Sequence, residues 1–114
     1  MFRIWAKSKI SNAKITQTEL EYEGSITLPP EVIRAADIMP GEMVQVLNMN
    51  NGSRLETYVI EGDPESRNIC LNGPAARKGM VGDRVMVVSY GIGESYEVGP
   101  LKVVQLDGEN RIKE

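Results

Sequence analysis

The sequence predicts a mainly β protein, a small barrel with short helices built from two similar strand-helix-turn-strand units. Three observations support this fold class. Short segments of alternating apolar and polar residues are separated by turns rich in glycine and proline, which is typical of strands joined by tight connections. The tripeptide Asn50-Asn51-Gly52 predicts a β-hairpin. A unit of the first half recurs in the second, and two such copies can close into a barrel without exposed edges.

The N-terminal region predicts several short strands. Apolar stretches between Phe2 and Thr16 indicate two strands around a polar turn at Lys7 to Asn12. Alternating apolar residues then flank Gly24-Ser25, which predicts a turn or bulge between two further strands. The N-terminal region is therefore expected to be entirely β.

A short helix is expected next. Pro29-Pro30-Glu31 marks its start, because proline is favoured in the first turn and an acidic side chain stabilises the positive end of the helix dipole. Val32, Ile33 and Ala36 would form its apolar side. The tight turn Met39-Pro40-Gly41-Glu42 is expected to end it.

The second half repeats the pattern of the first. At one constant offset, four residues of the first half align with four identical residues of the second: Met39, Gly41, Val44 and Val46 with Met80, Gly82, Val85 and Val87. Agreement in both order and identity indicates an internal duplication. Residues 1–114 are expected to form a single barrel domain, with a last strand at 101–106 and a frayed tail at 109–114.

Composition restricts the function. Thirteen basic against 16 acidic residues give a net charge of −3, which argues against nucleic acid as a partner because such proteins carry a basic face. No apolar run has membrane length, so no membrane partner is expected. The lone Cys70 cannot form an internal disulfide, and it is interpreted as a buried small hydrophobe in a cytoplasmic protein. Histidine is absent, which excludes the usual Ser-His-Asp triads and most zinc sites; no metal is expected.

Gly24-Ser25 has chemistry beyond that of an ordinary turn. The serine hydroxyl lies next to a carbonyl without a neighbouring side chain, and glycine adopts backbone angles closed to other residues. Where the backbone is strained, that hydroxyl can attack the preceding carbonyl and convert the amide into an ester. A simple turn remains the alternative interpretation.

Two family resemblances follow from the motifs. The segment Ile26 to Arg34, followed by Met39 to Val44, resembles the swapped-hairpin transcription regulators, which are small DNA-binding dimers. The second resemblance covers nearly the whole chain and rests on motifs in the expected order: Lys9, Tyr22-Glu23-Gly24-Ser25, Asn51-Gly52-x-Arg54, Thr57-Tyr58, Asn72-Gly73-Pro74-Ala75-Ala76, Val81-Gly82-Asp83 and Pro100 to Asn110. In these the chain is similar to pyruvoyl-dependent aspartate 1-decarboxylase, and we take this as the leading hypothesis.

This resemblance implies a double-psi β-barrel, made as a proenzyme that cleaves itself into residues 1–24 (the β chain) and 25–114 (the α chain). Ser25 would attack the Gly24 carbonyl, the ester would eliminate to dehydroalanine, and hydrolysis would leave a pyruvoyl group at position 25. That ketone would form a Schiff base with L-aspartate and accept the electrons released with carbon dioxide, without a metal or pyridoxal phosphate. The product, β-alanine, is the precursor of pantothenate and coenzyme A.

The resemblance also assigns the substrate residues. Arg54 would bind a substrate carboxylate, Tyr58 would protonate the carbanion, and Lys9 would add positive charge. Alternation along a strand places Arg54, Glu56 and Tyr58 on one face. Without the resemblance, Arg54 is an exposed strand residue, Tyr58 a half-buried one and Lys9 a solvated turn residue.

The cleavage site has further expected members. Thr57 would polarise the Gly24 carbonyl, although a regular strand turns it away from Tyr58, so either the strand bulges or the two residues serve different surfaces at a subunit interface. Asn72 would hydrogen-bond near the site, and Gly73, Pro74 and Ala75 would let the backbone approach the substrate. The alternative for Asn72 is a helix cap.

Assembly and specificity are also expectations. The resemblance implies a homotetramer with sites at subunit interfaces, and a maturation factor is a possible partner. The family pattern has a basic or aromatic residue where Ser11 stands and more often an aromatic one at Leu47. Both differences leave open how strictly the site selects aspartate.

Overall fold

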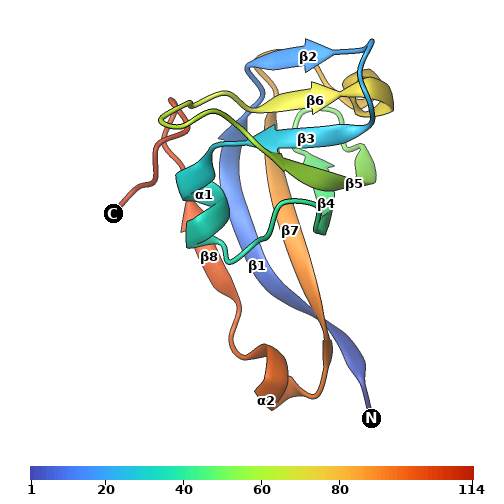
Figure 1. Cartoon of the computed structure of the whole chain (residues 1–114), viewed down its shortest axis with the longest axis vertical. Helices are drawn as coiled ribbons and strands as arrows, with labels where there is room; N and C mark the ends of the chain where they lie inside the picture. Colours follow the sequence, from blue (N-terminus) through green and yellow to red (C-terminus); the bar gives the residue numbers. More distant parts are fainter.

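The computed structural model describes residues 1–114 and is mainly β, as the sequence predicts (Figure 1). Its elements in chain order are β1 (Arg3–Lys14), β2 (Gln17–Glu19), β3 (Ser25–Leu28), α1 (Pro30–Ala35), β4 (Met43–Asn48), β5 (Arg54–Glu61), β6 (Cys70–Asn72), the 3₁₀ helix η1 (Gly73–Lys78), β7 (Arg84–Gly93), α2 (Ser95–Val98) and β8 (Lys102–Gln105). None of the helices has the length and hydrophobicity needed to cross a lipid bilayer.

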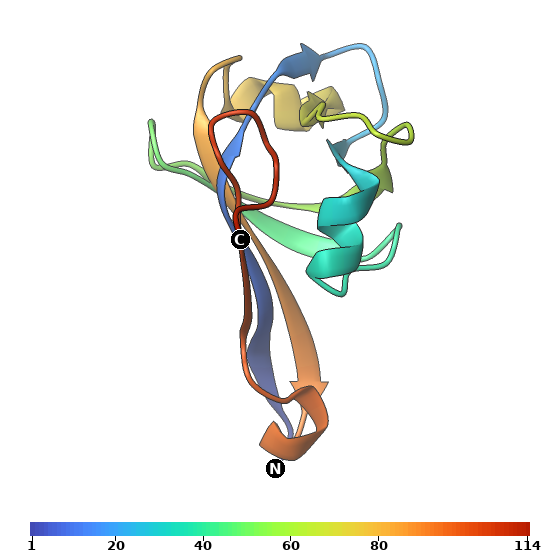
Figure 2. The same cartoon turned by 90° about the vertical axis from the view of Figure 1, so that its left-hand side faces the viewer.

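The strands form one strongly curved sheet in the order β2-β6-β3-β5-β4-β7-β1-β8. β2 and β1 lie near opposite ends of this strand order, yet only Ile15 and Thr16 separate them in the chain. The sheet must therefore curve until these two strands meet. The Ile15 amide donates to the Asp83 carbonyl and the Thr16 amide to the Ile69 carbonyl, both at 2.9 Å. The sheet thus curls around an apolar core, and β1 and β7 extend beyond it as a ribbon that ends beside α2 (Figure 2).

The predicted duplication is visible in the pairing of β4 with β7. Val46 pairs with its own counterpart Val87, while Val44 pairs with Ser89 and Asn48 with Val85. This antiparallel register relates the two strands by a local two-fold axis. The two copies therefore share one core, in which the buried side chains of both central strands meet.

The turns before β4 and β7 are also equivalent. Gly41 and Gly82 have φ values of 91° and 97°, a region that favours glycine. An acidic side chain closes each turn: Glu42 accepts the Met39 amide at 3.0 Å and Asp83 accepts the Met80 amide at 2.9 Å. Hydrogen bonds from Asn48 and from the Met80 amide lower the pKa of Asp83, because they stabilise its charged form.

The expected pair of strands between Phe2 and Thr16 is wrong. β1 runs without interruption from Arg3 to Lys14, with register shifts between Ala6 and Ser8 and between Ile10 and Ala13. The polar residues that suggested a turn are satisfied inside the strand. The hydroxyls of Ser8 and Ser89 hydrogen-bond at 2.5 Å in the core, and Asn12 donates to the Leu106 carbonyl at 2.9 Å.

The expected frayed tail also differs from the structure. Asn110 is 1% exposed and donates through its side-chain amide to the carbonyls of Lys14 and Arg67, at 2.9 and 3.1 Å. Ile112 forms a β-bridge with Leu106. The amide of Asn110 fixes this turn because it satisfies backbone groups of two distant segments.

The glycine turns generate a stability prediction. Gly41→Ala and Gly82→Ala should each lower the free energy of unfolding by about 1 kcal/mol, because an L side chain at positive φ is strained. Urea denaturation measures this. Gly108→Ala is the control, since Gly108 has open space around it and no positive φ, and it should not lower the free energy of unfolding. Wild-type stability of either turn variant would contradict the equivalence of the two turns.

Candidate active site

The register of β3 and β5 brings Gly24 and Thr57 together. These strands are parallel, with Ile26 opposite Val59, and the same register carried back two residues sets Gly24 opposite Thr57. Both residues line a cavity of about 250 Å³ with Pro74 and Ala75. The other lining residues are Leu55, Glu56 and Lys78.

Ser25 is fully buried at the start of β3, opposite Asn72 of β6. The side-chain amide of Asn72 donates to Ser25 Oγ at 2.9 Å and to Thr27 Oγ1 at 3.0 Å. The Ser25 hydroxyl donates to the Glu23 carbonyl over a long 3.4 Å. The serine is thus held in place chiefly by Asn72.

Asn72 also occupies the N-cap position of η1, as the alternative interpretation held, but its side chain makes no capping hydrogen bond. It bonds Ser25 and Thr27 instead. Its Oδ1 accepts a hydrogen bond from the thiol of Cys70 at 3.1 Å. All polar atoms of this amide are therefore used within a cluster of four side chains, of which Ser25, Cys70 and Asn72 are buried and Thr27 is half-buried.

Cys70 is buried, as expected, and it is also hydrogen-bonded. Burial raises the pKa of its thiol, and the negative charge of Glu19 raises it further. Both effects disfavour the thiolate, so the thiol remains a hydrogen-bond donor at neutral pH. The apolar run around Cys70 gave no signal for this contact.

Gly73 packs directly against the backbone that precedes Ser25. A Cβ atom at this position would lie 2.3 Å from the Tyr22 carbonyl oxygen and 2.8 Å from the Gly24 nitrogen, and the φ of Gly73 is 62°. Both the close approach and the backbone angle require glycine. The exposed ring of Tyr22 plays no part in this contact, which its backbone makes.

Arg54, Tyr58 and Lys9 lie elsewhere, on what we call the outer face: the side of β5, β4, β7 and β1 turned away from the core. Along β5 the residues alternate as predicted, with Arg54, Glu56 and Tyr58 exposed. Lys9 belongs to this face because the paired residues Lys9, Val88, Gln45 and Glu56 form one row across the sheet. Arg54, Tyr58 and Lys9 do not line the Gly24 cavity, whereas Pro74 and Ala75, also expected near the substrate, do.

The pairing of β4 with β5 decides between the two interpretations of Thr57. Val44 pairs with Thr57 and Met43 with Tyr58, in a register without shifts. The strand therefore has no bulge at this point. Thr57 and Tyr58 face opposite sides of the sheet.

Lys78 was not expected at the site. It lines the Gly24 cavity, and its carbonyl accepts hydrogen bonds from Asn48, Asn51 and Ser53 at 3.2, 3.0 and 2.9 Å. The β4–β5 hairpin, which carries Thr57, is thereby tied to the end of η1. The Asn51-Gly52 pair predicted the hairpin, but a local motif could not show that the Lys78 carbonyl accepts its hydrogen bonds.

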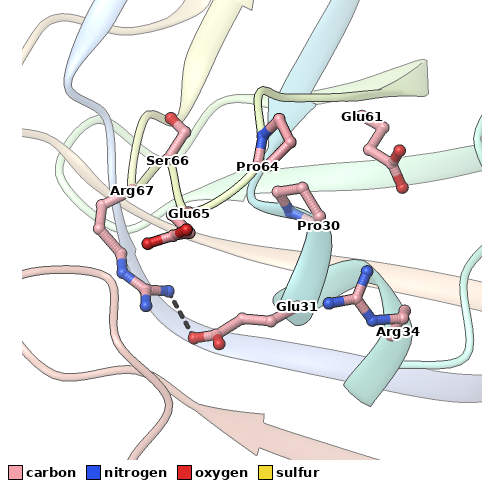
Figure 3. Close-up of a pocket in the computed structure, with 8 residues that line it drawn as sticks. All are labelled: Pro30, Glu31, Arg34, Glu61, Pro64, Glu65, Ser66 and Arg67. Carbon is pink, nitrogen blue, oxygen red and sulfur yellow. Dashed lines mark hydrogen bonds and ion pairs between the residues drawn. The ribbon is translucent and has the colours of Figure 1, made fainter.

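Another cavity, of about 300 Å³, lies beside α1 and holds an ion pair between Glu31 and Arg67 (Figure 3). Its lining is Pro30, Glu31, Arg34, Glu61, Pro64, Glu65, Ser66 and Arg67. None of these is a predicted site residue. The Gly24 cavity and the Ser25 cluster are therefore the better candidate site.

Comparison with solved structures supports the predicted barrel. The rationally designed double-psi β-barrel protein mkDPBB_sym_86 has a TM-score of 0.51 and 17% identity, covering 68% of this chain and 90% of its own. The computationally designed msDPBB_sym2 has a TM-score of 0.50 and 14% identity, covering 78% and 99%. At these identities the likeness concerns the fold alone.

Sequence relatives are closer. Aspartate 1-decarboxylase of Desulfitobacterium hafniense is 50% identical over 116 residues, covering 99% of this chain and 91% of its own. The enzyme of the same name from Kosmotoga olearia is 50% identical over 110 residues, covering 96% of each chain. That of Listeria monocytogenes is 46% identical over 115 residues, covering 99% and 91%.

The family model described as aspartate decarboxylase matches residues 1–113. This match favours the decarboxylase resemblance over that to the swapped-hairpin regulators, which concerns only the segment around α1 and the start of β4. The chain belongs to the aspartate decarboxylase family.

Proposed function

We propose that the chain is a proenzyme that cuts itself between Gly24 and Ser25 and becomes a pyruvoyl-dependent decarboxylase converting L-aspartate to β-alanine and carbon dioxide. One observation carries the proposal: the fully buried Ser25 hydroxyl is bonded to Asn72, next to a Gly24 that shares a cavity with Thr57. The names of the chain's relatives support the substrate.

The cleavage begins when Ser25 Oγ adds to the Gly24 carbonyl carbon. The carbon–nitrogen bond breaks, the hydroxyl proton passes to the freed nitrogen, and an ester forms. Loss of the proton on Cα of residue 25 then expels the Gly24 carboxylate and leaves dehydroalanine. Water replaces its nitrogen, which departs as ammonia, so residues 25–114 begin with a ketone.

This chain's residues fit those steps. The amide of Asn72 donates to Ser25 Oγ, and the hydroxyl proton makes only a long 3.4 Å contact with the Glu23 carbonyl, so it can move to the nitrogen. Thr57 lines the same cavity as Gly24, and its hydroxyl would polarise the carbonyl. Gly73 leaves room for the backbone that must rearrange, because a side chain there would collide with the Gly24 nitrogen.

A pyruvoyl group at position 25 would supply the electron sink that decarboxylation of an α-amino acid requires. Position 25 suits it, because the site is buried and Asn72 provides a hydrogen-bond donor. Arg54 would bind a substrate carboxylate through its planar guanidinium. Tyr58 would donate a proton to the product carbon, and Lys9 would attract the dianionic substrate.

These substrate residues support a site built by two subunits. Arg54 and Lys9 lie on the outer face, whereas Thr57 and Gly24 line a cavity on the opposite side of β5. The substrate residues of one chain therefore point away from its own Gly24 cavity. The outer face also carries a cavity of about 380 Å³ that exposes apolar side chains of Ile4, Met43 and Ile92. We therefore propose that a neighbouring chain of a homotetramer contributes Arg54 and Lys9.

The metabolic setting follows from the product. β-Alanine made in the cytoplasm would serve pantothenate and coenzyme A synthesis.

Leu47 pairs with Arg54 on the outer face, so the leucine would shape the wall next to the bound carboxylate. Ser11, on β1, is half-buried. A maturation factor would act on the rate of cleavage.

Self-cleavage is tested by mass spectrometry of the denatured protein. The wild-type chain should separate into residues 1–24 and 25–114, the larger fragment lighter than its sequence because serine has become pyruvoyl. Ser25→Ala should remain intact, since it lacks the nucleophile, whereas Ser95→Ala on exposed α2 should be cut normally. A wild-type chain that stays whole, both alone and in a lysate of its source organism, would refute the proposal.

The role of Thr57 is tested by a matched pair. Thr57→Val keeps the shape but removes the hydroxyl, and it should slow cleavage by about 100-fold, the usual effect of losing one donor to a developing oxyanion. Thr57→Ser keeps the hydroxyl and should be cut at nearly the wild-type rate. Equal cleavage of both variants, followed by gel electrophoresis over time, would assign Thr57 a packing role only.

The shared site is tested by complementation. Ser25→Ala lacks the reactive group and Arg54→Ala lacks the substrate contact, so each should be inactive in its own homo-oligomer. Co-expressed with different tags and purified together, they should regain about one quarter of the wild-type activity. A complete site needs Ser25 from one chain and Arg54 from its neighbour, and random mixing supplies each intact residue about half of the time. Absence of activity in a verified mixed assembly would place both residues in one chain's site.

A further inference from the structure

The cluster around Ser25 contains a thiol, that of Cys70, which the cleavage chemistry does not use. Cys70 Sγ lies 3.1 Å from Asn72 Oδ1, and Asn72 Nδ2 lies 2.9 Å from Ser25 Oγ. The three residues form a chain across the paired strands β6 and β3. Cys70, Asn72 and Ser25 are 3%, 4% and 0% exposed, so no water competes for these contacts.

The orientation of the Asn72 amide matters for the first chemical step. With its NH₂ group toward Ser25, as in the structure, Ser25 Oγ accepts a hydrogen bond and its own proton can pass to the departing nitrogen. With the amide turned over, Oδ1 would face Ser25 and bind that proton. The hydroxyl would then be held in the wrong direction for proton transfer.

Ser25 and Thr27 fix this orientation only weakly. The Ser25 hydroxyl donates to the Glu23 carbonyl over a long 3.4 Å, and the Thr27 hydroxyl can either donate or accept. The thiol of Cys70 is different, because it donates through S–H while its sulfur is only a weak acceptor. It therefore favours Oδ1 as its neighbour and directs the NH₂ group to Ser25.

We propose that Cys70 is a positioning residue for self-cleavage: its thiol orients the Asn72 side-chain amide so that the amide donates to Ser25 Oγ. The inference rests on the proposed cleavage between Gly24 and Ser25. It gives a hydrogen-bonding role to a cysteine that packing alone would explain as a small buried hydrophobe.

Cys70→Ser and Cys70→Ala form a matched pair that separates these two roles. The variants differ by one hydroxyl, so both leave similar space next to Asn72. Serine keeps a donor toward Oδ1 and should cleave at close to the wild-type rate. Alanine removes the donor and should slow cleavage by about three- to tenfold, the usual effect of one buried hydrogen bond. A purely packing role predicts the reverse order, because alanine is the better buried hydrophobe.

The rate constant is measured from the appearance of residues 25–114 in freshly synthesised chain, with the melting temperature of each variant recorded alongside. Ile69→Val is the stability control: Ile69 is a fully buried neighbour in the core cluster and bonds Thr16 only through its backbone. It should lower the melting temperature without slowing cleavage.

The outcomes are distinct. If the wild-type chain is cut, and Cys70→Ala is cut as fast as Cys70→Ser, the positioning role of Cys70 is overturned while the proposed cleavage stands. Cleavage that falls in step with melting temperature across all variants, Ile69→Val included, also overturns it. A wild-type chain that is never cut overturns the proposed function and this inference with it.

Discussion

The register of β3 is the constraint on which the site depends. This strand lies between β5, to which it is parallel, and β6, to which it is antiparallel. Ile26 is fully buried, next to Val59 on one side and Leu71 on the other. A slip by one residue would turn Ile26 outward and Ser25 into the core. The apolar packing of Ile26 thus also fixes Ser25 opposite Asn72.

The duplicated barrel explains why neither half of the chain could form this site. Gly24 and Ser25 lie at the start of the β3-α1-β4 unit and Asn72 at the end of β6 in the β6-η1-β7 unit, while Thr57 lies on β5 between them. The two copies have also diverged at the point that matters. α1 follows Pro29, which has no polar side chain, while η1 follows Asn72, whose amide reaches Ser25. The two helix starts therefore differ, and the second one contributes the side chain that holds Ser25.

Local signals in the sequence predicted the local structure well, and the long-range contacts poorly. The turns at Gly41 and Gly82 and the helix start at Pro30 depend on residues close in sequence. The continuity of β1 depends on its pairing with β7, and the Ser8 hydroxyl finds its partner in Ser89, far away in the chain. A hydroxyl in a strand gives the same pattern whether or not such a partner exists. The family motifs identified Gly24, Thr57 and Asn72, but Cys70 lies outside every motif.

Alternation along β5 places a residue proposed for cleavage and a residue proposed for substrate binding on opposite faces of one strand. Thr57 faces the Gly24 cavity, whereas Arg54 lies on the outer face. Every residue proposed for cleavage belongs to a single chain and is in place once the barrel has closed. The residues proposed for substrate binding become a site only when another chain covers the outer face. The proposal therefore implies that cleavage does not require assembly whereas decarboxylation does, so the two proposed activities should be separable by diluting the chain.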